Sequence, residues 1–129
     1  MAREYEPLKI TQKIIDMMLY TYPELKQFPK SEKYAMAADI KQCMDRMLER
    51  SIEVDKHYFK KTTLRDLDVE VAKAKTYVLV AYQLKFLPER KFLNISDYLS
   101  EIGAMVGGFL QAVEPADGRR TKNNTGNGL

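Results

Sequence analysis

The chain has few of the residues on which catalytic and metal sites depend. It contains one cysteine, one histidine and no tryptophan among 129 residues. A single cysteine excludes an internal disulfide framework and is typical of a reducing compartment, so we expect a cytoplasmic protein. The one histidine, His57, stands between Lys56 and Tyr58, where a surface position is the simplest interpretation.

Long apolar segments are also missing. No run approaches the roughly 18 residues needed to span a bilayer, and the N-terminal MAREYEPLK lacks the apolar region of a signal peptide. We therefore expect no membrane association. Glycine and proline are scarce, at 6 and 5 residues, whereas methionine reaches 7. This composition favours helices over a β-sandwich or barrel.

Motifs for enzyme chemistry are absent from the sequence. A di-metal site in a helical bundle needs Glu-x-x-His pairs, and Glu49 and Glu53 have no such partner. Glycine-rich phosphate motifs are missing, and Cys43 lies near an apolar stripe, where an inert thiol is expected. We expect a non-enzymatic protein with no cofactor, no metal and no small-molecule substrate, and a small enzyme or metal protein is the last alternative.

Four segments carry apolar residues at every third or fourth position, which predicts four amphipathic helices. They cover about residues 10–28, 31–58, 64–87 and 96–114. Ser31 and Ser96 stand where N-cap residues are expected, Pro23 should kink or shorten the first helix, and Pro115 should end the fourth.

The short connections between these segments imply antiparallel neighbours. The predicted fold is therefore all-α, an antiparallel up-down-up-down four-helix bundle. It occupies residues 1–114, and the polar, Gly- and Asn-rich residues 115–129 should form a disordered basic tail. Of the net charge of +3, the tail supplies +2, which leaves +1 for the bundle. A basic surface must therefore come from how charge is distributed.

One end of the predicted bundle collects basic residues, because alternate helix ends meet there. The residues at that end are Lys26, Lys30, Lys33, Lys85, Arg90 and Lys91, and Arg65, Lys73 and Lys75 follow the third helix. Lys30 and Lys33 are unexpected at a helix start, where the dipole favours acids. These nine residues are either an ordinary solvated surface or candidate nucleic-acid contacts to phosphates. Nearby aromatics such as Phe28 and Phe86 either stack on unpaired bases or close the bundle end.

Glycines interrupt the fourth predicted helix in the stretch EIGAMVGGFL. Gly103 and Gly107 are one turn apart, and Gly108 follows. Each costs about 0.5–1 kcal/mol relative to alanine inside a helix, so we expect close packing that offsets this cost. The packing partner is either another helix of the bundle or another subunit.

Three stretches of the chain together resemble the bAvd-like four-helix-bundle family, the accessory variability determinant proteins of diversity-generating retroelements, which are related to proteins encoded in rRNA intervening sequences. The stretches are YTYPELKQFPKSEKYAMAADIKQ, DLDVEVAKAKTYVLVAYQL and YLSEIGAMVGGFLQAV. The resemblance covers about residues 10 to 113. The family's third helix commonly carries two basic residues one turn apart. In this chain the first of the two positions is Lys75, but the second is Leu79, so half of the basic pair is missing.

The resemblance implies a function without catalysis. Proteins of this family form ring-like homopentamers that bind the element's reverse transcriptase and its structured template RNA, which supports mutagenic cDNA synthesis. The same surfaces are expected to accept DNA or an RNA/DNA hybrid. The alternative is an oligomeric protein-interaction module with no direct nucleic-acid role.

Overall fold

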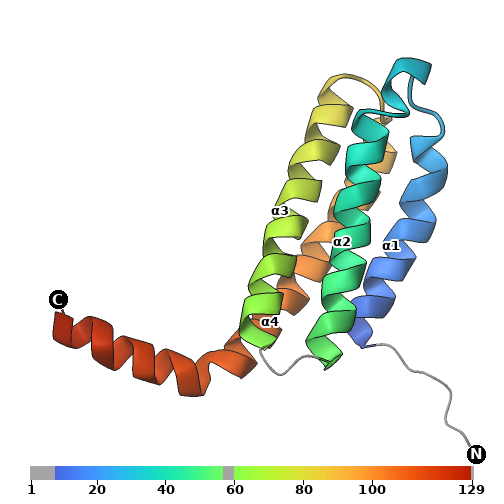
Figure 1. The fold of residues 1–129 in the computed structure, drawn as a ribbon. Helices are drawn as coiled ribbons and strands as arrows, with labels where there is room; N and C mark the ends of the chain where they lie inside the picture. The colour runs from blue at the N-terminus through green and yellow to red at the C-terminus, as the bar shows by residue number, and fades with distance from the viewer. Residues whose placement is uncertain (1–7, 57–59, 129) are drawn as a thin grey trace, which may run out of the picture.

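The chain folds into four helices in a computed structural model that describes residues 8–56 and 60–128, with side chains described as far as residue 113. The elements, in order, are α1 (Lys9–Leu25), the short 3-10 helix η1 (Lys30–Glu32), α2 (Met36–Lys56), α3 (Lys60–Gln83) and α4 (Glu89–Gly128). Successive helices run antiparallel (Figure 1), which confirms the predicted all-helical bundle; no strand occurs in the described ranges.

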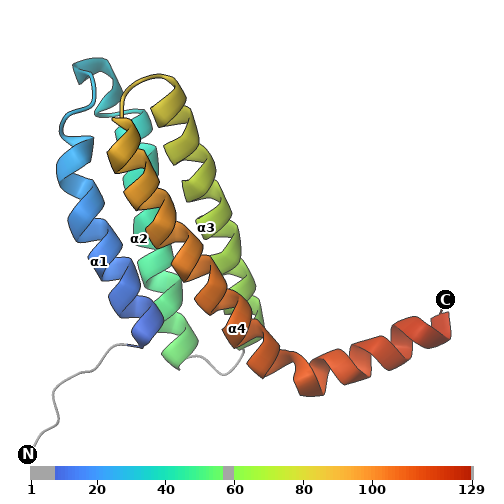
Figure 2. The ribbon, with the colours of Figure 1, turned by 180° about the vertical axis from the view of Figure 1, so that it is seen from behind.

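Each helix packs against its neighbours in sequence, and α1 also packs against α4 to complete the bundle. The α1–α2 and α3–α4 connections lie at one end of the bundle, as both views show (Figures 1 and 2). One core fills the interior, and its largest fully buried side chains are aliphatic or methionine: Ile10, Ile14, Met17, Leu25, Ile40, Met44, Met47, Leu64, Leu67, Ile95, Leu99 and Ile102. The described helices include none that is long and apolar enough to cross a bilayer.

The start of α2 differs from the prediction. Ser31 lies inside η1 without a side-chain capping bond to that element, and α2 begins only at Met36, so Ser31 is not its N-cap. The buried ring of Phe28 fixes the chain beneath the turn, and residues 33–35 continue as turns before α2 starts. Tyr34 therefore precedes the helix and is 92 % exposed.

The fourth helix begins earlier than predicted. It starts at Glu89, directly after Pro88, and Ser96 lies within it rather than at its N-cap. A proline is compatible with a helix start, because a backbone N–H there has no partner in the helix. Ile95 is fully buried on the same stripe as Leu99 and Ile102, so residues that we took for a loop extend the apolar face of α4.

The far end of α4 also differs from the expected helix end. The helix continues through Pro115 to Gly128, and its last part turns away from the bundle (Figures 1 and 2, red). Proline removes one backbone hydrogen bond, which permits such a bend without ending the helix. Nearer the N-terminus, Pro23 likewise lies inside α1, which ends at Leu25. The division into a domain over 1–114 and a disordered tail over 115–129 stays a prediction.

Candidate nucleic-acid interface

Six of the predicted basic residues meet at the end of the bundle where α1 joins α2 and α3 joins α4 (Figure 1). We call this surface the basic pole; its cations are Lys26, Lys30, Lys33, Lys85, Arg90 and Lys91. The rings of Phe28 and Phe86 lie 5.6 Å apart between centroids and hold the two connections against each other. Tertiary packing thus places together two groups of cations that are about sixty residues apart in sequence.

Five of these cations are available for an external partner. Lys26, Lys30, Lys33, Lys85 and Arg90 are exposed, and none forms an ion pair with another described residue. Lys91 differs, because its Nζ lies 3.3 Å from the Glu24 carboxylate and 5.1 Å from the centre of the Tyr20 ring. Acids lie at the same end: Glu24, Glu32 and Glu89 beside the cations and Asp39 in the first turn of α2, so the six cations exceed these four acids by two.

Lys30 and Lys33 do not stand in the first turn of α2, contrary to the prediction. Lys30 belongs to η1 and Lys33 follows it, whereas the first turn of α2 carries Asp39. An acid in the first turn is what the helix dipole favours. Lys30 and Lys33 therefore cost α2 no dipole energy and project from a tight turn ahead of the helix.

Lys85 has a backbone conformation that lysine seldom adopts. Its φ is 66°, the only positive value among the described non-glycine residues. The Phe86 N–H donates to the Ala81 carbonyl and the Lys85 N–H to the Tyr82 carbonyl, the pattern that closes a helix in a Schellman motif. Glycine is the usual residue at this position, so the lysine here occupies a strained site beside the other cations.

The three remaining cations of the predicted set, on α3, are not part of the basic pole. Lys73 lies 3.7 Å from the Glu70 carboxylate, on the side that faces α2. Lys75 turns its ammonium toward Gly103 of α4, since a Cβ built on that glycine would be 3.9 Å away. Arg65 is exposed near the first turns of α3. The fold therefore separates the predicted nucleic-acid set into one cluster of six and three scattered residues.

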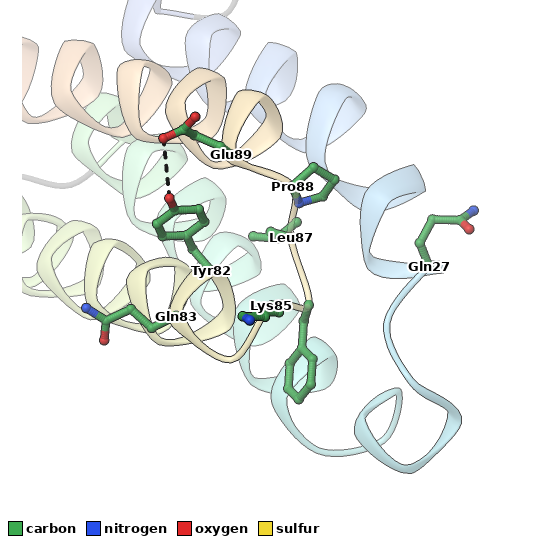
Figure 3. A pocket seen from close by; sticks show the side chains of 8 residues that line it. Gln27, Tyr82, Gln83, Lys85, Leu87, Pro88 and Glu89 are labelled. Atoms are coloured by element: carbon green, nitrogen blue, oxygen red, sulfur yellow. Dashed lines mark hydrogen bonds between the residues drawn. The ribbon is translucent and has the colours of Figure 1, made fainter.

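A cleft opens at the basic pole between the end of α1 and the α3–α4 connection (Figure 3). We call it the pole cleft; its volume is about 650 Å³ and its lining residues are Gln27, Tyr82, Gln83, Lys85, Phe86, Leu87, Pro88 and Glu89. Lys85 and Phe86 were predictable from the sequence, whereas Tyr82 and the two glutamines were not, because only the meeting of the two connections brings these residues together.

A second hollow, which we call the α2–α3 groove, is predominantly apolar. It measures about 570 Å³, and its lining residues are Met36, Arg46, Val69, Ala72, Lys73, Thr76, Tyr77 and Val80. Val69 and Tyr77 are exposed there, Leu79 is exposed elsewhere on α3, and Leu84 is exposed just after the end of that helix. A contiguous apolar groove is a candidate surface for contact with another protein, whereas single exposed apolar side chains are ordinary.

A charged network lies beneath this groove. Glu70 is only 8 % exposed, and its carboxylate accepts a hydrogen bond from Arg46 Nε at 3.1 Å. This bond raises the pKa of the Arg46 guanidinium above its usual range. Burial, together with the nearby Glu70 charge, raises the pKa of the Cys43 thiol. Cys43 is thus a protonated, unreactive thiol at neutral pH, as the sequence suggested.

Gly107 and Gly108 of α4 face open space within the single chain, whereas Gly103 faces α3. A Cβ added at Gly107 or Gly108 would meet no other side chain within 4 Å, and one at Gly103 would make an ordinary contact of 3.8 Å with Val71. Close packing inside the bundle therefore does not explain Gly107 and Gly108. The other predicted explanation, contact with a second subunit, stays a prediction.

Metal-binding groups are missing from the described part of the chain. Among the described residues, no three His, Cys, Asp or Glu side chains are grouped so that they could hold a metal ion. His57 lies outside the described ranges, as do the neighbouring residues 58 and 59. The same described residues display an exposed cluster of cations, a shallow cleft and an apolar groove.

The fold defines the class: an all-helical protein whose described helices form a four-helix bundle. The family comparison is specific, because the model of the bAvd-like family matches residues 8–113, which include nearly all of the bundle. The chain belongs to the bAvd-like family, as the three sequence stretches indicated. None of the curated proteins matches the chain.

Proposed function

We propose that this protein is the non-enzymatic accessory subunit of a diversity-generating retroelement. It binds the element's reverse transcriptase and structured template RNA in the cytoplasm and supports mutagenic cDNA synthesis. Membership of the bAvd-like family supports the accessory role. The single observation that carries RNA binding is the basic pole, where five exposed cations have no ion-pair partner among the described residues.

The mechanism is scaffolding by charge. Lysine and arginine side chains at the basic pole contact phosphates and release condensed counterions, so the affinity falls steeply with salt. The contacts carry no sequence information by themselves, and specificity comes from RNA shape and from the reverse transcriptase. DNA and RNA/DNA hybrids present the same phosphate charge and bind by the same contacts.

A gel-shift series with structured RNA over increasing salt tests this proposal. The double variant Lys30→Glu/Lys33→Glu should weaken RNA binding. It should also reduce the magnitude of the slope of log affinity against log salt by about 1–2, because each phosphate contact contributes about 0.7–0.9 to that magnitude. The control Lys9→Glu/Lys56→Glu makes the same charge change at the opposite end of the bundle, where the slope should stay unchanged. Equal losses in both variants would show a general charge effect and contradict a role for the basic pole.

We further propose that the protomers assemble into a homopentameric ring. The α2–α3 groove and the open glycine face of α4 are both unfilled in the single chain, which supports self-association. Sedimentation equilibrium should give about five times the protomer mass of 15.0 kDa. A monomer at micromolar concentration would contradict the ring.

The second candidate function is an oligomeric protein-interaction module without a nucleic-acid role. The observation that favours it is the α2–α3 groove, with Val69 and Tyr77 exposed to solvent. This function predicts that reverse transcriptase binds and that RNA does not bind even at low salt.

A further inference from the structure

The basic pole carries features that phosphate binding alone does not explain. Tyr34 is 92 % exposed and directly follows Lys33 in the turn before α2. An aromatic ring with almost no protein cover contributes little to the fold. Its free faces are instead suited to stacking on a flat aromatic ligand.

The pole cleft offers a second aromatic surface that is held rigidly. Phe92 stacks on the Tyr82 ring at 4.3 Å between centroids and an interplanar angle of 9°. The Tyr82 hydroxyl donates to the Glu89 carboxylate at 3.4 Å (Figure 3). Phe86 is held by its contact with Phe28 on the opposite connection. A ligand that stacks here meets walls already in place, which reduces the entropy lost on binding.

The polar groups of the pole cleft are of the kind that hydrogen-bond base edges. Gln27 and Gln83 are exposed at its rim and supply amide donors and acceptors, and Glu89 supplies a carboxylate acceptor. The carboxylate repels phosphate, so a nucleotide would enter base first. Its backbone would stay outside, where Lys30, Lys33 and Lys85 are exposed.

From these observations we infer that the basic pole binds unpaired nucleotides of a single-stranded RNA segment. One base enters the pole cleft against Tyr82 and Phe86, another stacks on Tyr34, and the lysines contact the phosphates between them. This inference rests on the proposed RNA binding and adds a substrate class to it. In a duplex the bases are stacked on each other, and neither aromatic surface can reach a base face.

Fluorescence anisotropy with a labelled single-stranded RNA and with a duplex of equal length tests the inference. The single strand should bind about tenfold tighter, and Tyr34→Ala should weaken its binding roughly fivefold or more while it leaves duplex binding unchanged. Tyr34→Phe should keep the affinity, because the ring is retained. Leu19→Ala is the matched control, since Leu19 is 71 % exposed on α1 outside the basic pole, and it should change neither affinity.

Photocrosslinking supplies a readout that does not depend on variant stability. A single-stranded RNA with 4-thiouridine should crosslink to the peptides that contain Tyr34 and Tyr82, as identified by mass spectrometry. Crosslinks confined to other segments would overturn the inference. So would equal affinity for single strand and duplex with no effect of Tyr34→Ala, although salt-sensitive RNA binding would then still support the proposed function. Absence of binding to either RNA at low salt would overturn both.

Discussion

Glu70 shows how a single buried charge shapes one side of the protein. Its side chain is 10 % exposed and its two carboxylate oxygens face Arg46 at 3.1 Å and Lys73 at 3.7 Å. Lys73 is exposed but shares its charge with this carboxylate, so it has less to offer a phosphate than the free lysines of the basic pole. The position of Glu70 therefore explains why Lys73, predicted as a contact, is the weaker candidate.

Removal of Arg46 should destabilise the bundle. Arg46→Ala removes the hydrogen-bond donor of the buried Glu70 carboxylate and leaves it only the Lys73 ammonium at 3.7 Å, which should cost about 1–3 kcal/mol of unfolding free energy. The control Arg50→Ala breaks an ion pair with Glu53 on the same helix, in which both side chains are about a third exposed, and should cost about 0.5 kcal/mol or less. Urea denaturation measures both, and equal costs would contradict the structural role of Glu70.

Lys85 should reveal a trade between stability and binding. Lys85→Gly relieves a left-handed backbone conformation and should raise the unfolding free energy by about 1 kcal/mol, while it removes a cation and weakens RNA binding. Gln83→Gly is the control, and its change in unfolding free energy should have the opposite sign. Gln83 is the last helical residue of α3, where glycine should lower the unfolding free energy. If Lys85→Gly is less stable than the parent, the lysine side chain stabilises the loop and the strain argument is wrong.

At the scale of the element, α4 carries the least explained feature, because two glycines are exposed in a helix interior. Gly107 and Gly108 weaken α4 and meet nothing within 4 Å in the single chain. No contact within the chain offsets the helix stability that these glycines cost, and close packing of a second subunit on this face would offset it. The same face has no lysine or arginine between Asn94 and Glu114, which makes it unsuited to RNA and suited to protein.

Substitutions at Gly107 separate folding from assembly. Gly107→Ala should raise the Tm, because alanine favours the helix by about 0.5–1 kcal/mol over glycine. Gly107→Leu should leave the protomer folded, since open space surrounds the site, and should break the oligomer. The control Gln42→Leu adds the same side chain at an exposed position of α2 and should leave the oligomer intact. If Gly107→Leu stays fully assembled in sedimentation velocity, α4 is not the interface.

At the scale of the whole molecule, the sequence predicts the number and order of the helices better than the residues at which they begin. Periodicity located four helices and their antiparallel order, because apolar stripes such as Ile40, Met44 and Met47 reflect burial directly. Helix starts were predicted poorly. Ser31 and Ser96 have the chemistry of N-caps, but the position of Phe28 beneath the turn and the permissive Pro88 decided where α2 and α4 begin.

The candidate site was only half predictable for a related reason. Antiparallel order was enough to bring six cations to one end, so the basic pole followed from the topology. Tyr34 and Tyr82 could not be assigned, because the first depends on where α2 starts and the second on ring packing against Phe92. A tyrosine that directly follows a lysine in a proline-containing turn was the available signal for Tyr34.

Sedimentation velocity on a mixture of the protein, the reverse transcriptase and a labelled template RNA tests the central claim most directly. The account predicts one complex that contains all three, from which RNA is lost when Lys30→Glu/Lys33→Glu replaces the parent chain while the protein still sediments with reverse transcriptase. A complex of protein and reverse transcriptase that leaves RNA unbound at low salt would contradict the account and establish the interaction module instead.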